Sequence, residues 1–196
     1  REAGPVPQAP EPVLPSPLAP AGPFAEAAVD AAAAALAAAQ RPVLVAGRGA
    51  WLSGAGAALG ALADATGALT ASTALGRGVF PDARYDLGVT GGFGAEGAME
   101  LIRSADVALV VGASLNQFTM RFGALFAPGT TVIQVDVAPA ASHPHVGAYL
   151  RGDARLVSEA LFERVRAIGA APSGWRESVG VDAARVRPTG DGLAAD

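Results

Sequence analysis

Short apolar runs that end in glycine or an acidic residue recur along the chain, and they predict the strands of a parallel sheet. Residues 43–45 are apolar without alternation, which indicates a strand buried on both faces. Residues 106–112 repeat the pattern, with glycine at the exit, and predict a central strand. Further strands are predicted at residues 68–71, 130–136 and 149–150. We therefore expect the rest of the chain to cover this sheet.

Segments with helical spacing separate these runs. Residues 24–40 are rich in alanine, and Glu26 and Asp30 stand near the start, where the helix dipole favours acids. Asp153 occupies an N-cap position ahead of apolar residues at helical spacing. The predicted helices cover residues 24–40, 55–66, 96–104 and 153–168. Residues 42–71 then form a strand, helix and strand, which is the right-handed crossover unit of a parallel sheet.

Three segments lack this periodicity. Residues 72–94 hold six glycines and predict a long loop. A loop of this length is either functional or a sign that the assignment as a loop is wrong. Residues 1–23 contain eight of the fifteen prolines, which is typical of an interdomain linker or a strap. A proline-rich ligand for an aromatic groove is the alternative for that segment. Residues 170–196 are polar and irregular and predict a second linker.

Composition limits the classes of function. With 51% hydrophobic residues, the 196-residue chain can fill one core of ordinary domain size. A net charge of -4 argues against binding to nucleic acid or to an anionic membrane surface. The chain has no cysteine, so a disulfide framework, a thiol nucleophile and a cysteine-bound metal are excluded. This composition is compatible with the cytoplasm, which is the location we expect.

Glycine and polar residues after the predicted strands indicate a nucleotide-sized site, because the carboxyl ends of parallel strands meet at one edge of the sheet. Gly47 and Gly49 would allow a tight turn and close approach of the backbone to a ligand. The third glycine of a dinucleotide fingerprint is replaced by Leu52, so an ordinary NAD site is not expected. These glycines could equally form tight strand exits. Asp136 could bind a ribose or cap a turn.

Other polar residues offer weaker candidates for chemistry. Arg48 and Arg121 could face phosphates or lie in solvent. His143 and His145 have a spacing that can bind metal, but no acid or thiol nearby completes a ligand set. The sequence contains no evident pair of catalytic carboxylates and no Ser-His-Asp order. We therefore predict no catalytic residues and no metal site in this chain.

Five segments, taken together and in this order, closely resemble the central domain of thiamine-diphosphate-dependent enzymes, the family of acetolactate synthase and its decarboxylase and carboligase relatives. These segments are residues 41–50, 70–81, 105–113, 132–136 and 152–153. The resemblance covers roughly residues 25 to 168. It implies an α/β fold of three layers around a six-stranded parallel Rossmann-like sheet, of the sirtuin-like or DHS-like type.

The resemblance also implies a place within a longer enzyme. Residues 24–169 would form the central domain, between a pyrimidine-binding domain and a diphosphate-binding domain. Residues 1–23 and 170–196 would be the linkers to them. Thiamine diphosphate and Mg²⁺ would bind only in the full-length parent, so this chain alone is expected to be inactive. The missing catalytic domains would be its partners, together with further copies in a homo-oligomer.

In acetolactate synthases this domain holds FAD, and in other members ADP or nothing. By resemblance, the cofactor contacts would fall on Gly47, Gly49, Gly91, Gly94, Asp136, Val137 and Asp153. The chain departs from the FAD-binding members at Ser114 and Phe118, where those members place arginines. The loss of two positive charges removes expected partners of the phosphates.

Three hypotheses follow. The first is a non-catalytic central domain that braces the catalytic domains of an acetolactate synthase-like enzyme, with exposed surfaces that promote self-association. The second is an FAD- or ADP-binding nucleotide module. The third is a deacylase on the related sirtuin fold, which would need a zinc site of four cysteines in a chain that has none.

Overall fold

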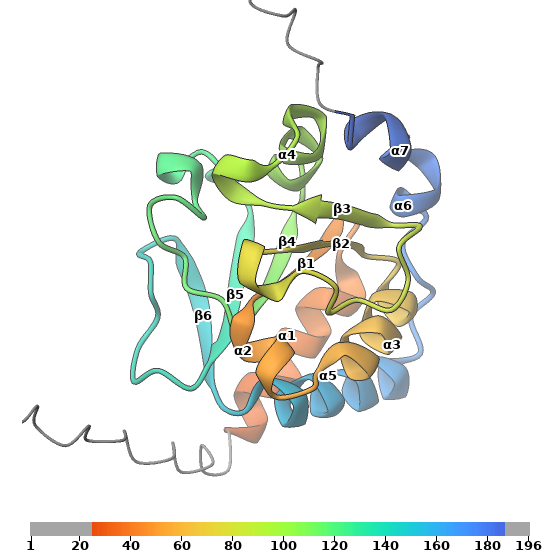
Figure 1. Cartoon of the computed structure of the whole chain (residues 1–196). Helices are drawn as coiled ribbons and strands as arrows, with labels where there is room; N and C mark the ends of the chain where they lie inside the picture. The colour runs from red at the N-terminus through yellow and green to blue at the C-terminus, as the bar shows by residue number, and fades with distance from the viewer. Residues whose placement is uncertain (1–24, 187–196) are drawn as a thin grey trace, which may run out of the picture.

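The computed structural model describes residues 25–186, which form a three-layer α/β domain (Figure 1). Six strands make one sheet in the order β3-β2-β1-β4-β5-β6, and every neighbouring pair is parallel. The strands are β1 Pro42–Ala46, β2 Leu69–Ser72, β3 Asp86–Val89, β4 Val107–Val111, β5 Thr131–Asp136 and β6 Val146–Arg151. The predicted fold class is therefore confirmed. The predicted linker at residues 1–23 lies outside the described residues.

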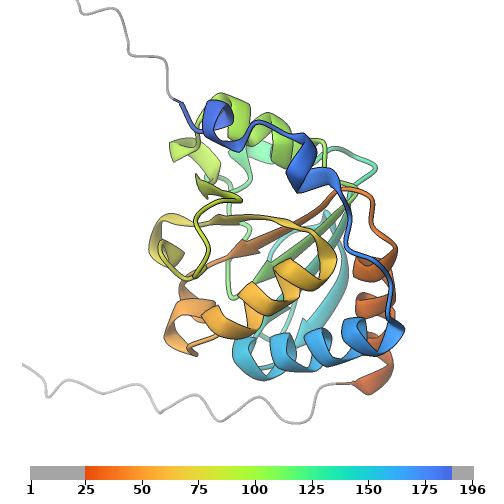
Figure 2. The same cartoon turned by 90° about the vertical axis from the view of Figure 1, so that its right-hand side faces the viewer.

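Helices cover both faces of the sheet (Figure 2). One face carries α1 Glu26–Ala38, α3 Gly56–Thr66 and α5 Ala154–Ile168, and the other carries α4 Glu96–Arg103. Successive residues of β1 point into different cores: Val43 and Val45 into one, Leu44 into the other. This two-sided burial is the reason that the β1 sequence is apolar without alternation.

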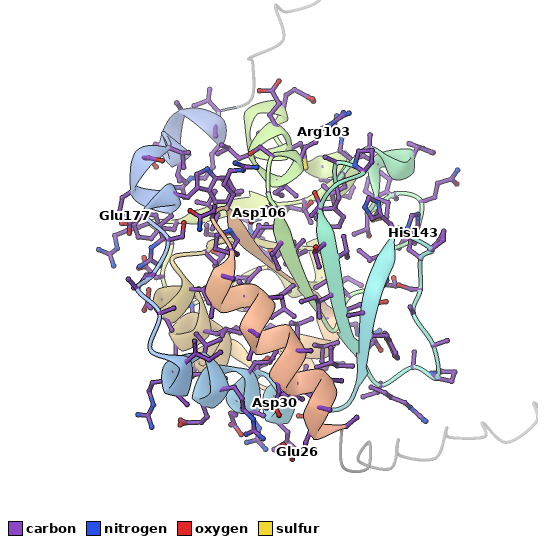
Figure 3. All side chains as sticks on the ribbon, turned by 180° about the vertical axis from the view of Figure 1, so that it is seen from behind. Glu26, Asp30, Arg103, Asp106, His143 and Glu177 are labelled. Atoms are coloured by element: carbon purple, nitrogen blue, oxygen red, sulfur yellow. The ribbon has the colours of Figure 1, made fainter. Side chains whose placement is uncertain are left out.

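Local sequence signals set several element ends as expected. The Asp153 carboxylate accepts hydrogen bonds from the amides of Arg155 and Leu156, at 3.0 and 3.1 Å, and so caps α5. Gly67 ends α3 in the left-handed conformation, with φ 68°. The Asp106 carboxylate accepts from the amides of Gln40 and Arg41, at 2.8 and 2.9 Å, which ties the α1–β1 connection to the start of β4 (Figure 3).

Two elements differ from the sequence-based expectation. The segment at residues 72–94, predicted as a loop, contains the edge strand β3 and two short 3-10 turns, η1 Ala74–Gly76 and η2 Gly91–Phe93. In β3 only Leu87 is buried, and Gly88 has φ 81°, so no alternating pattern marks this strand. After β1, a short helix, α2 Arg48–Leu52, begins immediately where a loop was expected.

Residues 170–186 return along the domain and are not irregular throughout. They contain α6 Trp175–Ser178 and α7 Val181–Ala184, and α7 contacts α4 and β3. Val181 is buried in the same core as α4. This part of the predicted second linker therefore packs on the domain, whereas its role as a linker stays a prediction.

Arg176 holds this returning segment. Its guanidinium pairs with Asp64 at 3.0 Å and Glu177 at 2.9 Å, and it lies over the Tyr85 ring at 4.4 Å from the centroid. Burial lowers the pKa of Arg176, but the hydrogen bonds to Glu177 and Asp64 outweigh burial and raise that pKa overall. One side chain thereby joins the end of α3, the approach to β3 and α6.

Removal of the Arg176 side chain should release the returning segment. For Arg176→Ala we expect the free energy of unfolding to fall by about 1–3 kcal/mol, because hydrogen bonds between charged groups and a ring contact are lost together. Urea denaturation gives the loss, and hydrogen exchange should show faster exchange at the amides of residues 181–185. The control is Arg166→Ala, which removes a surface pair with Glu163 and should change stability by no more than about 0.5 kcal/mol. Equal losses for both variants would contradict the structural role of Arg176.

Gly112, at the exit of β4, should tolerate no side chain. It has φ 59°, and an added Cβ would lie 2.6 Å from the carbonyl carbon of Gly49. Gly112→Ala therefore combines backbone strain with a clash against backbone, and we expect a loss of about 2–5 kcal/mol in urea denaturation. The control is Gly147→Ala, where the nearest atom to the added Cβ is 3.8 Å away. A small effect of both substitutions would show that the loops after β1 and β4 are not in contact.

Candidate functional site

The loops that follow β1 and β4 lie at the topological switch point of the sheet. β1 is bordered by β2 on one side and β4 on the other, so the chain leaves these central strands toward opposite sides. In open α/β sheets, ligands bind in the crevice outside the carboxyl ends of the strands at this point. The connections after β1, β2, β3 and β4 therefore form the candidate site.

A cavity of about 220 Å³ opens at this edge. Its wall comes from the connections after all four strands. The lining residues are Arg48, Thr73, Ala74, Leu75, Thr90, Phe93, Gly112, Ala113, Ser114, Asn116, Phe118 and Thr119. The lining thus combines residues with hydroxyl and amide side chains and residues with aromatic and aliphatic ones.

The predicted glycine loop takes part in packing between loops. The Gly47 amide donates to the Val111 carbonyl at 2.9 Å, and the Gly49 amide donates to the Gly112 carbonyl at 2.8 Å. An added Cβ on Gly49 would lie 2.8 Å from the Gly112 Cα. Two backbone donors that could face a phosphate are therefore already bonded to the neighbouring loop, and this geometry fits the tight-exit alternative.

Gly91 and Gly94 lie in the turn after β3. Gly91 has φ 81°, and an added Cβ would lie 2.9 Å from the Phe118 carbonyl oxygen. At Gly94, an added Cβ would lie 2.5 Å from the sulfur of Met99. Both glycines allow the η2 turn to pack against its neighbours, while Phe93 between them reaches the cavity wall.

The remaining predicted contacts lie over the other half of the edge. The Asp136 carboxylate accepts from the Ala138 amide at 3.1 Å, and so it caps a turn. The Val137 carbonyl accepts from the Arg151 guanidinium at 3.2 Å. Of the seven predicted residues, all of which the structure describes, none lines the cavity. Their role in cofactor binding stays a prediction.

Arg48 is the cation of the cavity wall. Its side chain is exposed and forms no hydrogen bond or ion pair with another residue of the segment 25–186. Nearby, the Asn116 side-chain oxygen accepts from the Thr119 amide at 2.8 Å, and its nitrogen donates to the Ser114 hydroxyl at 3.3 Å. Arg48 is therefore the group on this wall best placed to meet an anion.

Arg121, the second predicted phosphate contact, is already paired. Its guanidinium meets both oxygens of Glu96, at 3.2 and 2.8 Å, beside a separate cavity of about 450 Å³ along α4. The hydrogen bond from Arg121 lowers the pKa of the Glu96 carboxyl. Arg121 and Phe122 both have positive φ, 48° and 56°. The structure thus places Arg48 and Arg121 at different cavities.

The two histidines form no metal cluster. The His145 amide donates to Nδ1 of His143 at 3.1 Å, and the His145 ring meets Phe126 edge-on. Among residues 25–186, no group of three or more histidine, cysteine, aspartate or glutamate side chains could hold a metal ion. In the same part of the chain, no helix has the length and apolar character needed to cross a membrane.

Gln134 holds the cavity wall from behind. This fully buried side chain of β5 donates to the Ala113 carbonyl at 3.0 Å and to the Ser142 hydroxyl at 2.7 Å. The Ser142 hydroxyl in turn accepts from the Leu115 amide at 2.9 Å. Sequence reasoning missed this residue, although a glutamine in the middle of an apolar strand is the signal that could have found it.

The sheet order and the three layers define a Rossmann-like α/β domain. A family model described as the thiamine pyrophosphate enzyme central domain matches residues 29–161. The chain belongs to this family. The resemblance drawn from the sequence motifs is thereby confirmed.

Two solved structures are similar to this domain. One is assigned as a thiamin diphosphate-dependent enzyme from Mycobacterium smegmatis, with TM-score 0.62 and 26% identity over 80% of this chain. The other is benzoylformate decarboxylase from Polynucleobacter necessarius, with TM-score 0.60 and 23% identity over 80% of this chain, which shows the fold alone. The chain spans only 31% and 30% of these proteins. A comparison with curated proteins gives no match.

The Gln134 network should control the order of the cavity wall. Gln134→Leu keeps the volume similar but leaves the Ala113 carbonyl and Ser142 without their partner, so we expect a loss of about 1–3 kcal/mol in urea denaturation. Hydrogen exchange at the Leu115 amide should become faster. The control is Thr131→Val at the exposed start of the same strand, which should leave both quantities nearly unchanged. Unchanged protection of Leu115 in Gln134→Leu would refute the positioning role.

Proposed function

We propose that this chain is the non-catalytic central domain of an acetolactate synthase-like, thiamine-diphosphate-dependent enzyme, in which it braces the catalytic domains. Decarboxylation or carboligation of 2-keto acids, with thiamine diphosphate and Mg²⁺, belongs in this proposal to the parent enzyme. Membership of the central-domain family supports the placement. Assembly as a homo-oligomer and a cytoplasmic location are further parts of the proposal.

The single observation that carries the bracing role is the bonding between the loops after β1 and β4. The Gly47 and Gly49 amides are satisfied by Val111 and Gly112, at 2.9 and 2.8 Å. A phosphate at this position would have to replace protein hydrogen bonds that are already made, which costs free energy without gaining donors. Loops that are bonded to each other in this way suit a domain that holds others in place.

A second candidate function is nucleotide binding, with FAD or ADP as ligand. The cavity of about 220 Å³ beside Arg48 is the observation that favours it. Arg48 could pair with a phosphate, and the Phe118 ring could stack on a base. Against this candidate stand Ser114 and Phe118, which the resemblance places where FAD-binding members carry arginine.

Titration with ADP and with FAD separates the two candidates. For the brace we expect no saturable heat in calorimetry and no measurable rise in the melting temperature. A ligand present at 100 times its dissociation constant would stabilise the chain by about 2.7 kcal/mol. That gain would raise the melting temperature by several degrees, roughly 2–4 °C per kcal/mol for a domain of this size.

Arg48→Ala provides the matched control for this titration. Saturable binding by the chain that is lost in Arg48→Ala would assign the cavity to a nucleotide and overturn the brace as the sole role. Arg103→Ala, at an exposed arginine of α4 outside this cavity, should leave any such binding unchanged (Figure 3).

A further inference from the structure

Exposed apolar side chains gather at the carboxyl edge of the sheet. Of nine large apolar residues that are exposed among residues 25–186, six belong to the connections after β1, β2, β3 and β4. We call these six the carboxyl-edge apolar face: Trp51, Leu52, Leu75, Phe93, Phe118 and Phe122. Leu75 and Phe122 are 70% and 77% exposed. A concentration of this kind marks a surface that another element covers.

The cavity within this face has the chemistry of a groove for proline-rich chain. The Phe93 and Phe118 rings meet edge-on at 4.9 Å between centroids, and both line the cavity. Arg48 and Thr73 line the same cavity. Proline-rich segments bind to aromatic grooves, and they present carbonyl acceptors but few N–H donors. Aromatic rings beside side-chain donors therefore complement such a segment.

We propose that residues 5–23 of this chain bind across the carboxyl-edge apolar face as a strap, with part of the segment in the cavity. The segment holds eight prolines and stands directly before the described domain. In an extended proline-rich conformation of about 3.1 Å per residue, 19 such residues reach roughly 60 Å. A domain of this size measures roughly 40 Å across, as estimated from its radius of gyration. The extended segment is therefore longer than the domain is wide, and it can reach the cavity.

The charge of Arg48 favours this segment over a second copy of the domain as the occupant of the face. Arg48 of the cavity wall has no ion-pair partner among residues 25–186, and Glu11 stands between Pro10 and Pro12 in the segment. Two copies joined through the same face about a two-fold axis would place two Arg48 side chains in one interface, and no acidic residue among those lining the cavity could neutralise them. Binding within one chain also benefits from a local concentration in the millimolar range.

The occupant is independent of the reaction that the parent enzyme performs, so this inference goes beyond the proposed function. The segment can serve as a linker and still pack on the domain that follows it. A strap in this position would cover aromatic side chains at the switch point and fix the direction from which the preceding chain arrives.

Paired cysteines test the proposal, because the full chain contains no cysteine of its own. The test variant combines Leu14→Cys with Leu75→Cys on the face. The control combines Leu14→Cys with Ile168→Cys, which is 50% exposed at the end of α5. Under mild oxidation of dilute protein, we expect the intramolecular disulfide of the test variant to form about tenfold faster, a difference of about 1.4 kcal/mol. Mass spectrometry and non-reducing electrophoresis measure the rate.

Charge reversal supplies the second arm. Arg48→Glu in the test variant should lower its rate toward that of the control, and adding Glu11→Arg should restore it. Equal rates for the Leu75 and Ile168 pairs would overturn the proposal, since a tether alone would then explain the cross-link. Disulfide-linked dimers whose share rises with protein concentration would also overturn it, and would assign the face to a second copy.

Discussion

Backbone contact between the loops after β1 and β4 is the constraint on which the carboxyl edge depends. Gly49 donates to the Gly112 carbonyl at 2.8 Å, and an added Cβ on either glycine would enter the other loop. Such an approach is open only to glycine, and at Gly112 the positive φ adds a second reason. The loops after β1 and β4 are therefore in direct contact at a backbone junction. Both loops also line the cavity, so this contact fixes the position of its wall.

The junction also decides where a ligand or a strap could lie. At the centre of the edge, the backbone donors of Gly47 and Gly49 are bonded within the protein. The opening lies beside this junction, where Thr73, Phe93 and Phe118 from the connections after β2, β3 and β4 line it. Recognition there would depend on side chains, with Arg48 as the charge and the Phe93–Phe118 pair as the apolar surface. An aromatic wall with a single cation is a weaker match to a dinucleotide than a loop of free amides.

The sequence predicted the strands that are buried on both faces, because a short apolar run without alternation is typical of such strands. It did not predict β3, where Leu87 alone is buried, or α2, whose five residues are too few for helical periodicity. Residues such as Asp136 and Gly47 were singled out correctly as edge residues, but single residue types cannot reveal whether a neighbouring loop uses their hydrogen bonds. A glutamine within an apolar strand marks Gln134 itself, but its partners Ala113 and Ser142 lie outside that strand, and no local pattern identifies them.

Rigidity at both ends of the sheet connects these features to a bracing role. Asp106 and the charged pairs of Arg164 with Glu26 and Asp30 hold α1 against the sheet and α5 (Figure 3). Arg176 holds the returning segment against α3 and β3. The returning segment is thus fixed by the ion pairs of Arg176 and by the buried Val181 side chain, and a strap at the carboxyl edge would fix the preceding chain in the same way. In the proposed parent enzyme, two anchored connections would transmit position between the neighbouring domains, which free linkers could not do.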